Sequence, residues 1–205
     1  MNLNYDHYEK RLGVKLISWD DFHAICRGLA LAVKPYDPQV ILGISRGGLY
    51  AGTLISHLLQ KDFYAIYLTR RHQNQKVSEQ PIWLARPPEL VCNQRVLVVD
   101  EISSSGETLR IAKQELNRMG AKEARCAVMY THSWGTDVPD YIGLISDSLL
   151  INPWDREVVQ NGQIISNPEY VNALSMQGIE PSVTSQESEP SIHLPVKGRD
   201  TVYPY

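Results

Sequence analysis

Apolar residues recur at helical spacing in three segments of the chain, and short runs of consecutive apolar residues lie between them. The first segment begins after Ser18, a typical helix cap, and continues until Pro35. The second extends from Leu49 to Leu59. The third extends from Leu109 to Met119 and is followed by Gly120, a residue that suits the left-handed position after a helix. The pattern therefore predicts three amphipathic helices.

The consecutive apolar runs predict strands. They occupy five ranges: Val40 to Ile44, Phe63 to Leu68, Val96 to Val99, Ala127 to Tyr130 and Tyr141 to Ile145. An unbroken run of β-branched and aliphatic residues is typical of a strand buried on both faces of a sheet. Strands that alternate with helices favour right-handed crossovers. We therefore predict an α/β fold with a doubly wound, mainly parallel sheet flanked by helices.

Two regions interrupt this alternation. Residues 69–95 combine a cluster of basic and amide residues with three prolines. A connection of this length inside a compact domain is typical of a functional loop. We therefore expect a small mobile hood there. Residues 177–205 are mostly Ser, Glu, Pro and Gly, which favours a flexible C-terminal tail. The predicted organisation is an N-terminal extension over 1–15, the α/β domain over 16–176, and the tail.

Composition narrows the class of protein. The length of 205 residues with 43% hydrophobic residues suits one α/β domain with a modest extension. A formal net charge of −3 argues against nucleic acid as a partner, although a basic loop could still contact phosphates. Polar residues 1–10 and the lack of a long apolar segment predict a cytoplasmic protein without a membrane span. We expect the three cysteines to be reduced packing residues: Cys26, Cys92 and Cys126.

The candidate chemistry lies directly after the run at Val96 to Val99. Two adjacent acids, Asp100 and Glu101, come first, and a series of hydroxyl, glycine and acidic residues follows: Ser103, Ser104, Ser105, Gly106, Glu107 and Thr108. A helix start after a parallel strand presents unpaired amide hydrogens, so this loop predicts a phosphate site. The two carboxylates can accept hydrogen bonds from vicinal hydroxyls or hold a hard divalent cation with water. Helix capping explains only one or two of these residues, whereas a sugar phosphate fits both halves.

Residues 96–109 resemble the phosphoribosyl pyrophosphate fingerprint of type I phosphoribosyltransferases, which consists of hydrophobic residues, two acids and a Thr/Ser-Gly-x-Thr loop. The loop Ser45-Arg46-Gly47-Gly48 resembles the pyrophosphate loop of the xanthine-guanine branch of that family. Ser18-Trp19-Asp20 and Pro153-Trp154-Asp155 are similar to segments of the same branch. The resemblance covers roughly residues 16–157.

This resemblance implies a Mg²⁺-dependent transferase, expected to be a homodimer, that moves a phosphoribosyl group from phosphoribosyl pyrophosphate to a purine-like nitrogenous base and releases pyrophosphate. It implies that Asp100 and Glu101 bind the ribose hydroxyls and magnesium, and that the loop at 104–108 holds the 5-phosphate. Pyrophosphate would bind Ser45, Arg46 and Gly47, often through a cis peptide. The implied catalytic residues are Arg46, Glu101, Ser104 and Lys76, the last lying in the hood.

The sequence departs from the family pattern at several positions. Ser104 stands where the family usually has an Asp that assists proton removal from the purine, and a serine cannot do this at neutral pH without a partner base. Glu107 stands where small residues are common. Around Tyr130 to Gly135 there is no lysine to face a purine 6-oxo group, and a leucine stands in place of the stacking tryptophan. The candidate base-binding residues are His132, Trp134, Leu149 and Leu150.

Two alternatives to a transferase remain open at this point. Ser104 motivates the first, a regulatory protein of the same fold that senses phosphoribosyl pyrophosphate or a nucleotide with little or no turnover. The second, a dinucleotide-dependent oxidoreductase, is weaker. The glycine turn over 43–48 lacks the Gly-x-Gly-x-x-Gly spacing of that class.

Overall fold

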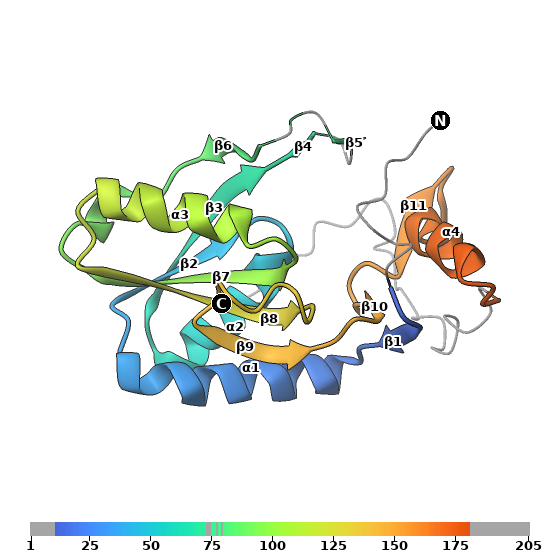
Figure 1. The fold of residues 1–205 in the computed structure, drawn as a ribbon, viewed down its shortest axis with the longest axis horizontal. Helices are drawn as coiled ribbons and strands as arrows, with labels where there is room; N and C mark the ends of the chain where they lie inside the picture. The colour runs from blue at the N-terminus through green and yellow to red at the C-terminus, as the bar shows by residue number, and fades with distance from the viewer. Residues whose placement is uncertain (1–10, 73–74, 77, 79, 181–205) are drawn as a thin grey trace, which may run out of the picture.

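A six-stranded sheet forms the centre of the molecule in the computed structural model, which describes residues 11–72, 75–76, 78 and 80–180 (Figure 1). The strand order is β6-β3-β2-β7-β8-β9. Neighbouring strands are parallel except for β3 with β6. The strands are β2 (Val40–Ile44), β3 (Asp62–Thr69), β6 (Ile82–Ala85), β7 (Arg95–Ser103), β8 (Glu123–Thr131) and β9 (Tyr141–Ile145). The predicted mainly parallel α/β sheet is confirmed.

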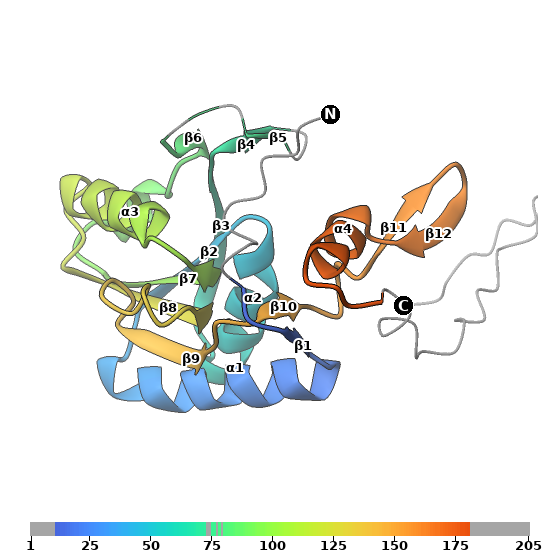
Figure 2. The ribbon, with the colours of Figure 1, turned by 45° about the vertical axis from the view of Figure 1, so that its right-hand side comes forward.

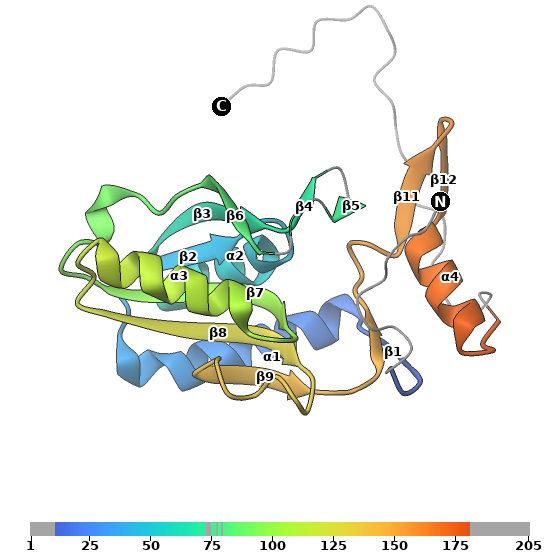
Figure 3. The ribbon, with the colours of Figure 1, turned by 45° about the horizontal axis from the view of Figure 1, so that its top comes forward.

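Helices cover both faces of this sheet. α1 (Trp19–Val33) and α2 (Gly47–Leu59) lie on one face, and α3 (Glu107–Arg118) lies on the other (Figures 1 and 3). α1 begins where the sequence predicts, because the Ser18 hydroxyl accepts a hydrogen bond from the Asp21 amide at 3.0 Å and the Asp21 carboxylate accepts one from the Ser18 amide. α2 begins two residues earlier than predicted.

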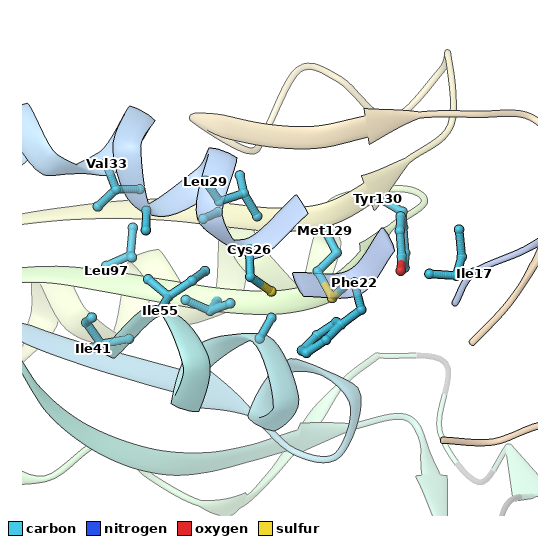
Figure 4. Packing of buried hydrophobic residues seen from close by; sticks show 14 of the residues in the cluster. Ile17, Phe22, Cys26, Leu29, Val33, Ile41, Ile55, Leu97, Met129 and Tyr130 are labelled. Atoms are coloured by element: carbon cyan, nitrogen blue, oxygen red, sulfur yellow. The ribbon is translucent and has the colours of Figure 1, made fainter. Parts of the chain in front are cut away.

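Each face of the sheet has its own hydrophobic core, and β7 contributes to both. Leu97 and Val99 pack with α1 and α2, whereas Val96 and Val98 pack on the side of α3. Figure 4 shows Leu97 in the first core beside Ile55 of α2. Successive side chains of a strand point to opposite faces, so a strand covered on both sides must be apolar at every position. This double burial explains the unbroken run in the sequence.

Two small two-stranded sheets and a helix lie outside the six-stranded sheet. β1 (Val14–Leu16) pairs in parallel with β10 (Leu149–Ile151), and the hairpin of β11 (Glu157–Gln160) and β12 (Gln163–Ser166) precedes α4 (Pro168–Met176). We call residues 157–176 the C-terminal lobe; Figure 2 shows its hairpin and helix side by side. A separate core joins the lobe to β10: Leu149, Ile151, Ala173 and Leu174.

The predicted hood contains short strands and turns in its described part. β4 (Arg71–His72) pairs with β5 (Gln75–Lys76), and β6 pairs with β3. The 3-10 turn η3 (Glu89–Val91) ends the hood. A second 3-10 turn, η2 (Lys34–Tyr36), lies outside it and follows α1. Most of the predicted tail, 181–205, and of the N-terminal extension, 1–10, lies outside the described residues. No helix within the described ranges is long and apolar enough to cross a membrane.

All three cysteines are free thiols, and the prediction that they are packing residues is confirmed for two of them and wrong for Cys92. Cys26 and Cys126 are buried free thiols in the two cores of the sheet. Cys92 is exposed, because it follows η3 at the surface rather than entering the sheet. Local apolar sequence around Cys92 therefore did not indicate burial.

An ion pair between Glu115 of α3 and Arg86 of the hood connects the hood to the helix. The Glu115 carboxylate accepts hydrogen bonds from Arg118 at 2.8 and 2.9 Å and from Arg86 at 2.5 Å, and these cations lower its pKa to about 2. A pKa depressed by folding stabilises the protein above the ordinary value of 4.5, and that contribution is lost as the pH falls toward 2. Because both arginines are more than half exposed, we expect Glu115→Gln to cost about 1 kcal/mol at pH 7.

The measurement is urea denaturation of the wild type and of Glu115→Gln at pH 7 and near pH 2. The difference in free energy of unfolding should disappear at the lower pH. Glu89→Gln, an exposed residue of η3, serves as the control and should be neutral at both. An equal cost of Glu115→Gln at both pH values would show that the ion pairs do not contribute.

Candidate active site

A cleft of about 750 Å³ opens where β2 and β7 end. Ligands of open α/β sheets collect beyond the carboxyl ends of the strands, so this is the expected place for a site. The loop after β2 and the end of β7 contribute to the lining, and so do β10 and the C-terminal lobe. Segments that are far apart in the sequence thus meet around one volume.

The loop after β2 forms one wall of the cleft. Ser45, Arg46 and Gly47 line it, and the peptide bond between Ser45 and Arg46 is cis, as the family resemblance implied. Gly47 passes directly against Glu101, because a Cβ atom built on Gly47 would lie 1.8 Å from Glu101 Oε2. Glycine is therefore the residue that lets the first turn of α2 approach the carboxylate.

The two predicted acids belong to β7 itself. Glu101 lines the cleft and accepts a hydrogen bond from the Asn152 side-chain amide, whereas Asp100 Oδ1 accepts one from the Glu101 backbone amide at 2.8 Å. Burial raises the pKa of both carboxyl groups, and for Glu101 the nearby charges of Asp155 and Asp100 raise it further. Buried carboxylates of like charge favour a ligand that supplies a cation or hydroxyl donors.

These carboxylates fit the magnesium that the family resemblance implies. Removing negative charges from water beside one another is costly, and a divalent cation would offset that cost. No group of three or more His, Cys, Asp or Glu side chains in the described part of the chain could hold a metal ion. Mg²⁺ at Asp100 and Glu101 would therefore complete its oxygen shell with water and with the bound ligand.

The predicted phosphate loop is the turn between β7 and α3. Gly106 has φ +72°, and a Cβ atom there would lie 2.3 Å from a Val138 methyl group, so both conformation and space require glycine. The Thr131 hydroxyl donates to the Ser103 carbonyl at 2.9 Å and fastens the start of the loop to β8. Ser104 lines the cleft. The rest of the predicted set forms the strand end, the turn and the helix start on either side of it: Ser103, Ser105, Gly106, Glu107 and Thr108.

Two arginines flank this loop. Arg70, at the base of the hood, forms an ion pair with Glu107, and Arg110 donates to the Ser105 carbonyl at 2.8 Å. The carboxylate of Glu107, which would repel a phosphate, is thus paired with a cation. Arg70 lies 37 positions from Glu107, so no local pattern could have indicated the pair.

The four candidate base-binding residues separate into two pairs. Leu149 and Leu150 line the cleft. His132 and Trp134 lie outside its lining: His132 is buried, its ring stacks on Trp134 at 4.6 Å between centroids, and its Nδ1 lies 2.7 Å from the Ser146 carbonyl oxygen. Burial lowers the pKa of His132, and the charge of Arg11, which contacts its ring, lowers it further.

Lys76 belongs to β5 of the hood, and the position of its side chain lies outside what the structure describes. The wall formed by the C-terminal lobe was not predicted from the sequence. The Tyr170 hydroxyl donates to Asp155 Oδ2 at 2.7 Å, and the neighbouring Trp154 stacks on Tyr50 at 4.5 Å between ring centroids. The only signal for this wall was the Pro153-Trp154-Asp155 segment.

Comparison with known proteins agrees with the geometry. The chain belongs to the phosphoribosyl transferase domain family, whose model matches residues 18–162. A xanthine-guanine phosphoribosyltransferase of Cereibacter sphaeroides is 29% identical over 147 residues, which are 68% of this chain and 85% of that protein.

Two solved structures share the fold. A purine phosphoribosyltransferase of Pyrococcus horikoshii has a TM-score of 0.64 and 26% identity, and the match covers 73% of this chain and 99% of the other. A hypothetical protein of Neisseria gonorrhoeae with bound ppGpp has a TM-score of 0.61 and 20% identity, and the match covers 81% and 97%. At that lower identity the second likeness supports the fold alone.

The approach of Gly47 to Glu101 predicts a specific sensitivity to a methyl group. Gly47→Ala should lower the free energy of unfolding by about 1–3 kcal/mol, because the new Cβ must displace the Glu101 side chain or the first turn of α2. Gly28→Ala in α1 is the matched control. Nothing lies within 4 Å of its Cβ position, so that change should stabilise the helix by up to about 1 kcal/mol.

Thermal and urea unfolding of the two variants measure this contrast. If Gly47→Ala were as stable as the wild type, the close approach of α2 to the end of β7 would be wrong.

Proposed function

We propose that this protein transfers a phosphoribosyl group from phosphoribosyl pyrophosphate to a purine-like nitrogenous base and releases pyrophosphate. The observation that carries the proposal is that a single cleft joins the cis-peptide loop at Arg46, the half-buried carboxylate of Glu101 and the phosphate-loop residue Ser104. Membership of the phosphoribosyl transferase domain family supports it. So does the likeness to a purine phosphoribosyltransferase of known structure.

The three parts of the donor correspond to three parts of the site. Arg46, with the Ser45 and Gly47 amides, binds the pyrophosphate, Asp100 and Glu101 accept hydrogen bonds from the ribose hydroxyls, and the loop that starts at Ser104 holds the 5-phosphate. During transfer the bond from ribose C1 to pyrophosphate oxygen breaks, a bond from C1 to the base nitrogen forms, and the base loses a proton. Positive charge on the sugar and negative charge on the leaving group both grow, so fixed groups of opposite sign accelerate the step.

Magnesium, when bound, neutralises charge on the diphosphate. Asp100 and Glu101 would hold it together with ligand oxygens. Lys76 of the hood is proposed to add a second cation for the leaving group.

Apolar side chains provide the surface for the base. Leu149 and Leu150 line the cleft together with Ile102, and we assign them to the two faces or the edge of the ring. His132 and Trp134 lie outside the lining, and His132 contacts Arg11, which does line it. We therefore assign His132 and Trp134 to holding Arg11.

A second candidate is a regulatory protein that binds phosphoribosyl pyrophosphate or a nucleotide without efficient turnover. Ser104 favours it, because a serine hydroxyl does not accept a proton at neutral pH without a partner base. The structural neighbour from Neisseria gonorrhoeae, which has ppGpp bound, shows a nucleotide held on this fold.

The two functions are separated by one assay of pyrophosphate release with the donor, Mg²⁺ and a panel of bases. A transferase releases pyrophosphate only when a suitable base is present, and Arg46→Gln should lower the rate at least roughly 100-fold. Arg27→Gln, at an exposed position of α1, is the matched control and should leave the rate unchanged. Donor binding without release for any base would favour the regulator, and absence of donor binding would contradict both.

The Arg70–Glu107 pair predicts opposite effects of two substitutions on phosphate binding. Arg70→Gln leaves the Glu107 carboxylate unpaired beside the phosphate loop, so the affinity for ribose 5-phosphate should fall by roughly 3- to 10-fold. Glu107→Gln removes the repulsion and should raise the affinity. The double variant should lie close to the wild type.

Isothermal titration calorimetry at low salt measures these affinities. Additive losses from both single substitutions would rule out charge compensation as the role of Arg70.

A further inference from the structure

Asn152 is a buried side chain that contacts the candidate site without lining the cleft. It follows β10, is 2% exposed, and donates a hydrogen bond from its amide nitrogen Nδ2 to Glu101 Oε1. Among the described residues this is its only side-chain hydrogen bond. The nitrogen must be the atom that faces Glu101, because an ionised carboxylate accepts hydrogen bonds and an amide oxygen cannot donate one. Asn152 can therefore act on a ligand only through Glu101.

The two oxygens of the Glu101 carboxylate lie between fixed groups. Oε1 accepts the hydrogen bond from Asn152, and Oε2 lies against the first turn of α2, where a Cβ atom on Gly47 would be only 1.8 Å away. Asp100, by contrast, is held by its own strand, since its Oδ1 accepts a hydrogen bond from the Glu101 backbone amide at 2.8 Å. Glu101 is thus the acid whose direction depends on a side chain 51 positions away in the sequence.

The backbone on each side of Asn152 is anchored. Ile151 is fully buried in the core that β10 shares with the lobe, and its carbonyl oxygen accepts a hydrogen bond from the Ile17 amide at 2.9 Å. Pro153 follows, and its ring fixes the backbone angle φ on that side. Because the asparagine side chain is short, an anchored backbone also fixes its amide group beside the end of β7.

The amide oxygen of Asn152 gives an independent observation. Asn152 Oδ1 is buried and has no hydrogen-bond partner in the part of the chain that the structure describes. Burying a polar atom without a partner costs free energy, so packing alone would favour an apolar residue of similar size, such as leucine, at this position. An asparagine that is present despite this cost points to a requirement for its N–H donor.

We propose that Asn152 is a positioning residue that directs the Glu101 carboxylate toward the hydroxyl groups of the ribose. The inference rests on the proposed function, in which Glu101 binds those hydroxyls, and it adds to the site a residue outside the cleft lining. A carboxylate held at Oε1 keeps its other acceptor positions directed at the ligand, whereas an unsupported one turns about its last bond. Removal of the donor should therefore weaken recognition of the sugar and leave recognition of the phosphate group unchanged.

Calorimetry with two probes, ribose 5-phosphate and inorganic phosphate, separates the two effects in the presence of Mg²⁺. Asn152→Leu should weaken the binding of ribose 5-phosphate roughly tenfold or more and change the affinity for inorganic phosphate less than about twofold. Asn152→Ala removes the same donor with a smaller side chain and should give the same result.

Ser56→Ala is the matched control, because it removes another buried side-chain hydrogen bond, from α2 outside the cleft lining, and it should leave both affinities unchanged. Thermal unfolding of each variant will show that it is folded. In the pyrophosphate-release assay, the Asn152 variants should raise the KM for the donor by a similar factor and leave the KM for the base within about twofold of the wild type.

A double-mutant cycle shows whether Asn152 acts through Glu101. When Glu101→Gln is already present, Asn152→Leu should weaken the binding of ribose 5-phosphate less than about twofold further. Additive losses, an equal loss for inorganic phosphate, or no loss from either Asn152 variant overturns the inference and leaves the transferase. Coupled losses without pyrophosphate release for any base support the inference and overturn the transferase. Absence of donor binding by the wild type overturns both.

Discussion

The arrangement of the cleft depends on how closely the first turn of α2 approaches the end of β7. A Cβ atom at Gly48 would lie 2.4 Å from the Val99 carbonyl oxygen, and one at Gly47 would overlap the Glu101 carboxylate. Two consecutive glycines therefore bring a helix N-terminus, with its unpaired amides, against two half-buried acids. The loop that carries Arg46, the carboxylate of Glu101 and the turn at Ser104 share one volume because of this contact.

This arrangement concentrates negative charge away from water. Asp100, Glu101 and Asp155 all have pKa values raised by burial, and for Glu101 the other two carboxylates add to the effect. The hydrogen bond from Asn152 offsets only part of that cost. Groups that are costly to bury cluster at functional sites, and Glu101 and Asp155 both line the cleft.

The sequence predicted what depends on local pattern and missed what depends on distant contacts. Four consecutive apolar residues predict that β7 is buried on both faces, and the spacing of Ser18 and Asp21 predicts the capping box of α1. The fingerprint at 96–109 indicated the site because its residues are also consecutive in the sequence. The Arg70–Glu107 pair, the exposure of Cys92 and the lobe's contribution to the cleft arise from tertiary packing, which no window of neighbouring residues encodes.

β10 divides its side chains between two hydrophobic cores. Leu150 packs with the core of the sheet, whereas Leu149 and Ile151 pack with the lobe. A strand of three residues thus connects the sheet, a large cooperative unit, to the lobe, a small one. Units of such different size unfold locally with different free energies. A substitution within the core of the lobe should therefore weaken that wall of the cleft at little cost to the sheet.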